Sequence, residues 1–342
     1  MKKIFFYMLF AVVLSACNKN KRMLDCSDVK EMKISQTHQV INKEYLGQIE
    51  GICAKDSMLV TMDYHDGMSY TLFNSVSGDS ILRFGEIGHG KGEIPLGCDI
   101  SVCNDAFMAF DDETHIAATY IMNSDTVCLK SDVFKYKIEN TQLTKLALTN
   151  NGMLLGMGTY MDKYQYVLFD RKGKVYDYAF ELYNYEDKNF NKFHKFLSNQ
   201  GKLVKHPSKD LYAGAVDFSS NIDFFSISKN KIKKTKEVRE GNPDMKVESV
   251  GGLNRVIPTG KAINGFIDLA ATESNVYALY SDELFKKIQY CSDTIFVFDW
   301  TGNVVCKMKM PNNVYYIAAT SSRLFTVEKD MDGYFIIVSY PI

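Results

Sequence analysis

The stretch that decides the fold is residues 294–308, which reads TIFVFDWTGNVVCKM. Two runs rich in β-branched and aromatic residues flank a polar turn that contains a glycine, which is the pattern of a β-hairpin. Two further runs of this kind, at 265–270 and 276–280, come just before it. Four antiparallel strands in succession form one blade of a β-propeller. Residues 263–310 therefore predict one complete blade.

The strand-turn-strand core of this blade recurs along the chain. Residues 166–175, YVLFDRKGKV, match 295–304 in residue type position for position, and a looser copy, YTLFNS, begins at residue 70. The spacings between these copies are about two and three times the roughly 40–50 residues of a propeller repeat. The pattern predicts six blades, at 48–84, 98–140, 143–180, 196–236, 263–310 and 314–341.

The predicted fold is all-β, a six-bladed β-propeller of four-stranded antiparallel blades. The last blade shows only three strands, and the segment near Ser35 to Ile41 can supply the fourth. An N-terminal strand in that position closes the ring and leaves no free edge strand. Two interruptions are expected. Residues 181–200, rich in Tyr, Asn, Lys and Phe, predict a short helix, and residues 236–261, which hold several Gly and Pro, predict a long loop.

The N-terminus has the features of a bacterial lipoprotein signal. A short positive n-region precedes an apolar run at 4–14, which is too short to span a bilayer. The sequence Leu-Ser-Ala-Cys that ends at Cys17 resembles a lipobox, in which the cysteine thiol is acylated. We therefore expect a signal peptide at 1–16, a lipidated tether at 17–32 and one propeller domain at 33–342.

Composition and charge indicate a folded domain that a lipid anchor holds at a membrane. Hydrophobic residues are 46% and charged residues 24%, close to the average globular domain. The net charge of -1 argues against a nucleic-acid partner, and we expect a monomer. Because no aspartate directly follows Cys17, the outer membrane is favoured over the inner one. A periplasm-facing orientation is expected, with the cell surface as the alternative.

The cysteines do not indicate a disulfide framework. The chain holds eight, of which Cys17 takes the lipid, so an odd number remains and no C-x-x-C motif occurs. Cys98 with Cys103, or Cys291 with Cys306, could pair in an oxidising compartment. The interpretation that these cysteines are small buried apolar residues is simpler.

Three segments carry a resemblance to known propellers. Residues 84–97, FGEIGHGKGEIPLG, resemble the junction between blades of NHL repeats, although Lys91 stands where proline is usual. Residues 266–272, FIDLAAT, and 276–281, VYALYS, resemble TolB-like six-bladed propeller lipoproteins. The resemblance extends from about residue 33, implies the six-bladed fold and carries no catalytic motif. The glycines near residue 90 suit tight turns, because no Gly-Lys-Ser/Thr ends the segment as in a phosphate loop.

The candidate binding residues lie in loops that meet on one face of the predicted propeller. These are the loops between second and third strands and the junctions between blades, and most are acidic. The candidates are Asp63, His65, Asp66, His89, Asp111, His115, Asp162, Asp282 and Asp330. Carboxylates and imidazoles suit a divalent cation such as calcium or zinc. Aspartates in tight turns, however, commonly accept hydrogen bonds from their own backbone.

The sequence favours a non-enzymatic binding or scaffold lipoprotein without a cofactor. Its partner on the loop-rich face would be a glycan, a peptide or another envelope protein, with aromatic rings from 181–200 contributing. Those rings, which could instead pack the short helix, are Tyr183, Tyr185, Phe190, Phe193 and Phe196. The alternative is a metal-dependent hydrolase or lyase of the gluconolactonase kind. That alternative requires three or more side chains to converge among Asp63, His65, Asp111, Asp162, Asp282 and Asp330.

Overall fold

The computed structural model describes most of the chain beyond the signal and tether. The residues described are 29–34, 39–40, 46, 48–95, 99–122, 129–183, 190–250, 253–285 and 290–342. The predicted signal peptide, Cys17, Cys98 and Tyr185 lie outside these residues. Within the described part, no helix has the length and apolar character to cross a bilayer.

The first three blades follow one another along the chain, each as a four-stranded antiparallel sheet. Blade one holds β3 (Gly51–Lys55), β4 (Met58–His65), β5 (Met68–Asn74) and β6 (Ser80–Glu86). Blade two holds β7 (Asp99–Cys103), β8 (Ala106–Asp111), β9 (Ile116–Met122) and β10 (Leu129–Lys135). Blade three holds β11 (Thr141–Leu148), β12 (Leu154–Tyr160), β13 (Tyr164–Phe169) and β14 (Val175–Glu181).

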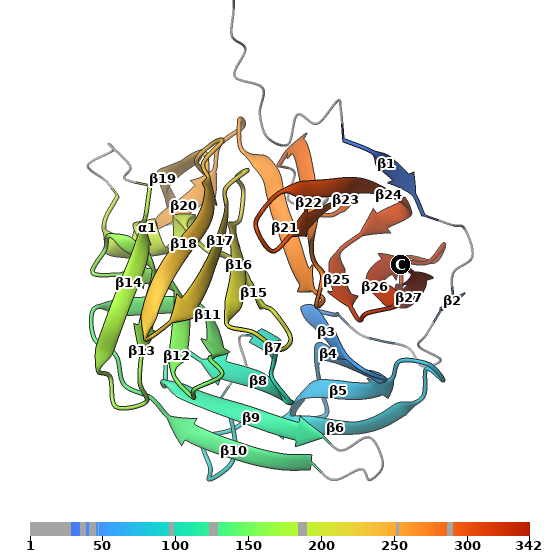
Figure 1. Cartoon of the computed structure of the whole chain (residues 1–342), viewed down its shortest axis with the longest axis horizontal. Helices are drawn as coiled ribbons and strands as arrows, with labels where there is room; N and C mark the ends of the chain where they lie inside the picture. The colour runs from blue at the N-terminus through green and yellow to red at the C-terminus, as the bar shows by residue number, and fades with distance from the viewer. Residues whose placement is uncertain are drawn as a thin grey trace, which may run out of the picture.

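The last three blades complete the ring (Figure 1). Blade four holds β15 (Gly201–Lys205), β16 (Leu211–Val216), β17 (Ile222–Ser228) and β18 (Lys231–Val238). Blade five holds β21 (Ile263–Ala271), β22 (Asn275–Leu284), β23 (Ser292–Asp299) and β24 (Val304–Val314). Blade six holds β25 (Tyr316–Ala319), β26 (Arg323–Lys329) and β27 (Phe335–Pro341). The six predicted blades are confirmed, and the first strand of each lies nearest the axis.

Aromatic side chains pack adjacent blades together. Tyr166 of blade three is fully buried, and its ring lies 4.7 Å from that of Phe225 in blade four. Phe224, on the other face of blade four, packs at 5.5 Å on Phe298 of blade five. Buried aromatic pairs contribute more than their area alone. Because both faces of each blade are covered, the inner strands are apolar with few interruptions.

Two N-terminal strands attach to the last two blades. β2 (Gln39–Val40) pairs antiparallel with β27 and forms the outer strand of blade six, as the sequence predicted for the segment near Ser35 to Ile41. β1 (Glu31–Lys33) was not predicted as a strand, and it pairs parallel with β24 as a fifth strand of blade five. Ordered structure therefore begins at or before residue 31, inside the segment predicted as tether.

The two predicted interruptions have different outcomes. The predicted short helix forms as α1 (Lys192–Ser198), which begins with a capping box between Asn191 and His194. The predicted long loop is wrong, because 236–261 contains the end of β18 and a hairpin of β19 (Met245–Val250) and β20 (Leu253–Pro258). The two strands are joined by a Gly-Gly dipeptide, which is itself a hairpin signal.

One glycine of the NHL-like junction is required by the backbone. Gly85 has a φ of +74°, and a Cβ there would lie 2.5 Å from the ring of Tyr70. Beyond it, the Gly90 backbone N–H donates to the Glu93 carboxylate at 2.6 Å. The junction is thus a compact turn that delivers the chain from blade one to blade two.

The described cysteines are all free thiols. Cys53, Cys103 and Cys306 are buried, and Cys291 is half-buried. Cys53 and Cys103 belong to first strands near the axis, where they fill space as small apolar side chains.

Candidate functional site

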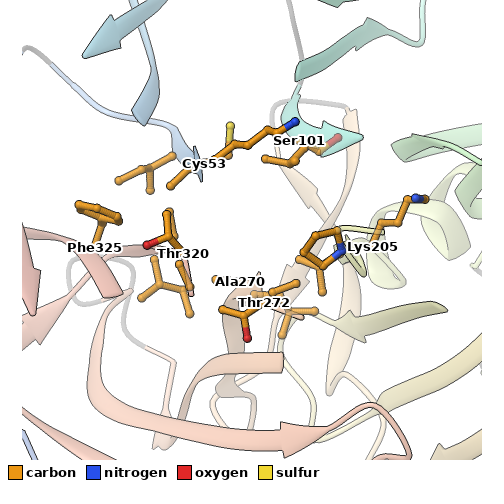
Figure 2. Close-up of a pocket in the computed structure, with 18 of the residues that line it drawn as sticks. Cys53, Ser101, Lys205, Ala270, Thr272, Thr320 and Phe325 are labelled. Atoms are coloured by element: carbon orange, nitrogen blue, oxygen red, sulfur yellow. The ribbon is translucent and has the colours of Figure 1, made fainter. Parts of the chain in front are cut away.

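A cavity of about 780 Å³ lies on the propeller axis. Its walls are the first strands of all six blades, β3, β7, β11, β15, β21 and β25. It opens between the turns that join first to second strands, which contribute Ser57, Asp105, Ser208, Glu273 and Ser321. Figure 2 shows side chains from several blades, among them Cys53, Lys205 and Thr320, around the open centre.

The inner end of the cavity holds a cluster of opposite charges. The Lys145 ammonium lies 2.6 Å from a carboxylate oxygen of Asp99. The Lys202 ammonium lies 3.7 Å from Asp217, a longer contact, and Lys202 lines the cavity. Asp268 also lines this end, within electrostatic range of both lysines. Four charged groups from four first strands therefore line this end of the cavity, and Asp217 from a neighbouring loop contacts one of them.

Burial has opposite effects on the pKa values of Asp268 and Lys202, and the neighbouring groups oppose it in both cases. Burial raises the pKa of Asp268 to about 6, although Lys202 and the backbone N–H groups of Ile317 and Leu269 oppose the shift. These N–H groups donate to its two oxygens at 2.8 and 2.9 Å. Burial lowers the pKa of Lys202, but Asp217 and Asp268 outweigh burial and hold it above the usual value. The inner end keeps a charged ammonium beside a carboxylate that exchanges its proton near pH 6.

The mouth of the cavity is held by contacts between different blades. Lys55 of blade one forms an ion pair with Asp105 of blade two at 2.9 Å. Lys205 of blade four donates to Asn104 of blade two at 2.7 Å and to Asn150 of blade three at 2.6 Å. Burial lowers the pKa of Lys205. These cross-blade bonds fix the turns around the opening.

Aromatic rings lie beyond the inner end of the cavity, on the face opposite the mouth. The Tyr290 hydroxyl donates to the Phe266 carbonyl at 3.3 Å, and the Phe218 ring packs at 5.6 Å on Tyr290 and at 5.1 Å on Phe285. Burial, with Asp217 nearby, raises the pKa of Tyr290 well above its usual range. A second groove of about 410 Å³ on that face shares Tyr316 with the cavity.

The residues predicted from the sequence lie on this second face, away from the cavity mouth. Three of the aspartates accept hydrogen bonds from residues of their own blade. The Thr71 hydroxyl donates to the Asp63 carboxylate, whose two oxygens lie 3.0 and 2.9 Å away, and burial raises the pKa of Asp63. Asp111 accepts from the Thr114 backbone at 2.7 Å. Asp330 accepts from two backbone N–H groups in its own turn. Asp111 and Asp330 therefore follow the interpretation in which turn aspartates accept hydrogen bonds from their own backbone, whereas Asp63 bonds a side chain.

The remaining candidates are spread over separate blades. His65 and Asp66 are exposed, and His65 Nδ1 lies 2.8 Å from a carboxylate oxygen of Asp66. The His115 ring stacks on Tyr136 at 5.1 Å. The others are exposed and stand apart from these: His89, Asp162 and Asp282. Among the described residues, no group of three His, Cys, Asp or Glu side chains is arranged to hold a metal ion. The convergence that a metal-dependent hydrolase or lyase requires is not found there.

Some aromatic residues of 181–200 pack against the short helix, and others are exposed. Phe190 is buried, and its ring meets that of His194 in α1. Tyr183 and Phe193 are exposed, at 40% and 49%. The helix packs against β12 and β20, so it covers part of blade three.

Sequence reasoning missed the charged cluster in the cavity. The available signal was a charged residue inside the apolar first strand of a blade, such as Lys145 in LTKLAL or Asp268 in FIDLAA. Charged residues are rarely buried without a partner. Such positions therefore indicate side chains that meet partners at the axis.

Comparison with known proteins agrees with this architecture. The model of the TolB-like 6-blade propeller-like family matches residues 29–322. The chain belongs to this family. A model of the prokaryotic membrane lipoprotein lipid attachment site matches residues 1–18, which include Cys17. This TolB-like propeller is therefore a membrane lipoprotein.

Solved structures and curated proteins add little beyond the family. U3-55K is 9% identical with a TM-score of 0.47, and the match covers 89% of this chain and 98% of that one. The β-propeller domain of Myceliophteria thermophila Cps50 (Swd1) is 9% identical with a TM-score of 0.42, covering 88% and 99%. No curated protein matches the TolB-like chain.

Proposed function

We propose that this lipoprotein is a non-enzymatic binding protein whose ligand enters the central cavity. The observation that carries the proposal is the cavity itself, because its volume of about 780 Å³ lies within the range of small-molecule sites. The mouth is held open by cross-blade bonds, so the site exists before a ligand arrives. Preformed sites avoid the cost of ordering their walls on binding.

The lining favours a polar ligand that carries both charges, such as a short peptide with free termini. Lys202 is available to a carboxylate, and Asp268 and Glu50 are available to an amine. Hydroxyl groups surround the opening. In the described lining only Tyr316 and Phe325 are aromatic, which gives little surface for stacking on sugar rings.

The proposed location is the outer membrane, with the propeller in the periplasm as a monomer. The residue after Cys17 is Asn18, so no aspartate is present to favour the inner membrane. The net charge of -1 supports a ligand other than nucleic acid.

Binding of a tripeptide library with free termini, measured by saturation-transfer NMR, tests the proposal. Ser321→Trp places a bulky ring at the exposed mouth and should abolish binding without touching the buried charges. Lys202→Met should weaken binding about tenfold or more, because a charged hydrogen bond is lost. Asp282→Ala on the loop-rich face is the matched control and should bind as the unmodified protein does.

The same experiment separates the two faces. If Asp282→Ala or Asp330→Ala loses binding while Ser321→Trp retains it, the loop-rich face is the site and the cavity proposal is wrong. If no peptide binds the unmodified protein, the proposed ligand class is wrong.

A further inference from the structure

The lipid anchor joins the propeller at the outer rim of blade five. β1 lies along β24 at the margin of the ring, and the described chain starts just before it (Figure 1). About twelve residues separate Cys17 from Val29, which reach at most about 40 Å when fully extended. The rim of blade five therefore lies within about 40 Å of the membrane that holds the acyl chains.

This rim carries lysines that point away from the core. Along β24, Val305, Lys307 and Lys309 alternate with buried residues, so they share the outward face of the strand. The register of β1 sets Glu31 beside Lys307 and Lys33 beside Lys309. Val305 is 51% exposed, which adds an apolar group among the charges.

The outer strand of blade four continues the basic surface. Residues 229–239 read KNKIKKTKEVR, and β18 occupies most of this stretch. The Lys236 ammonium donates to the Gly302 carbonyl at 2.8 Å, in the turn between β23 and β24. That bond places β18 against the blade that carries β1. We call the lysine-bearing surface of β18, β24 and β1 the basic rim.

Some charges of the basic rim are already compensated and others are not. Lys231 pairs with Asp177, Lys234 with Glu237 and Lys309 with Asp293. For Lys33, Lys233 and Lys307, no carboxylate of the described residues lies within ion-pair distance. Within the described part of the chain, these three ammonium groups have no carboxylate partner and can meet an external anion.

Lysines on an edge strand also prevent pairing between sheet edges. Prevention of edge pairing explains the lysines of β18, which is an edge strand. It does not explain Lys307, because β1 already covers the edge of β24. We propose that the basic rim docks on the head groups of anionic phospholipids in the membrane that holds the anchor. The propeller axis then lies along the membrane plane, and the cavity mouth opens to the side, clear of the lipid surface.

The single tryptophan of the chain reports on this contact. Trp300 lies in the turn between β23 and β24, two residues before Gly302. The lipidated full chain is reconstituted in vesicles that contain dansyl-phosphatidylethanolamine, and energy transfer from Trp300 is measured. Transfer should be higher with about one-third phosphatidylglycerol than with phosphatidylcholine alone, since anionic lipids attract basic segments. It should fall to the phosphatidylcholine level near 0.5 M salt, where the Debye length is about 4 Å.

A charge-reversal triple variant tests the residues. Lys33→Glu, Lys233→Glu and Lys307→Glu together should reduce transfer to the phosphatidylcholine level, because each lysine near the surface changes the docked ratio about fivefold. Blade two lies across the ring from blade five (Figure 1). The control reverses three exposed lysines there: Lys91 before blade two, Lys135 at the end of β10 and Lys137 two residues after it. The control changes net charge equally and should keep the transfer. Equal transfer in both lipid mixtures, or equal loss in both triple variants, overturns the proposal.

Discussion

Replacement of Asp268 by asparagine tests the electrostatics of the cavity most directly. Burial raises the pKa of this carboxyl from 3.8 to about 6, against the opposing effect of Lys202 and two backbone N–H donors. A shift of about two units corresponds to about 3 kcal/mol. The value of about 3 kcal/mol is an upper limit, because Asp268 lines a cavity that water can enter.

The sign of the pH dependence follows from the direction of the shift. Between about pH 4 and pH 6 the unfolded chain has released this proton and the folded chain still holds it. The folded state then binds more protons, so its stability falls as pH rises through this window. The asparagine side chain of the variant does not titrate, so the stability curve of the variant lacks this contribution.

The measurement is urea unfolding of both proteins at about pH 4, 5, 6 and 7, followed by circular dichroism. The free energy of unfolding of the unmodified protein, minus that of Asp268→Asn, should fall by up to about 3 kcal/mol from pH 4 to pH 7. The lost hydrogen bond to Leu269 or Ile317 shifts the variant at every pH and cancels in this slope. A difference that stays constant, or that rises with pH, would refute the argument that burial outweighs Lys202.

Three further predictions concern the anchor, the ring closure and a glycine at the axis. Cys17→Ser should incorporate no radiolabelled palmitate, since the thiol that carries the lipid is gone; labelling of this variant contradicts the lipobox assignment. The double change Gln39→Pro and Val40→Pro removes two N–H groups from β2 and should lower stability by about 2 kcal/mol or more in thermal melts, whereas alanines there should have a small effect. Equal melting temperatures for the two double variants would show that β2 does not hold the ring. Gly265→Ala should cost about 2–4 kcal/mol, because φ is +69° and the new Cβ would lie 2.4 Å from the Ser219 backbone nitrogen. Gly241→Ala meets nothing within 4 Å and should change stability by less than about 0.5 kcal/mol, so similar losses in both would contradict the close-approach argument.

Most of the blade architecture could be predicted because strand and turn signals are local. Apart from β1 and β2, each blade pairs strands that are neighbours in sequence, so the hairpin pattern at 294–308 fixes its own partners. The β19–β20 hairpin was missed because the Gly and Pro residues of 236–261 are also loop signals, although Met245 and Val247 alternate with the exposed Lys246 and Glu248. β1 was missed because three exposed residues gain order only from β24.

The predicted binding residues were chosen by residue type and loop position, and these two criteria fix only the face. The carboxylates of Asp111 and Asp330 accept hydrogen bonds from backbone N–H groups of their own turns. An aspartate in a loop has the same sequence pattern whether it bonds its own turn or binds a ligand. Whether His65, Asp162 and Asp282 contribute to a site stays a prediction. Their convergence depends on distances across the ring, and those distances have no local signature.

The sequence by itself determined the lipid anchor and the number of blades, because each rests on a contiguous pattern or on pairing between near neighbours. It also indicated the strand that closes the ring, although β2 and β27 lie at opposite ends of the chain, because the last blade shows only three strands of its own. The tertiary structure alone decided where the cavity lies and which charges line it. Asp99, Lys145, Lys202 and Asp268 come from first strands of four different blades. They meet only because the ring brings every first strand to one axis. There, burial raises the pKa of Asp268, and the neighbouring carboxylates raise the pKa of Lys202 against the effect of burial.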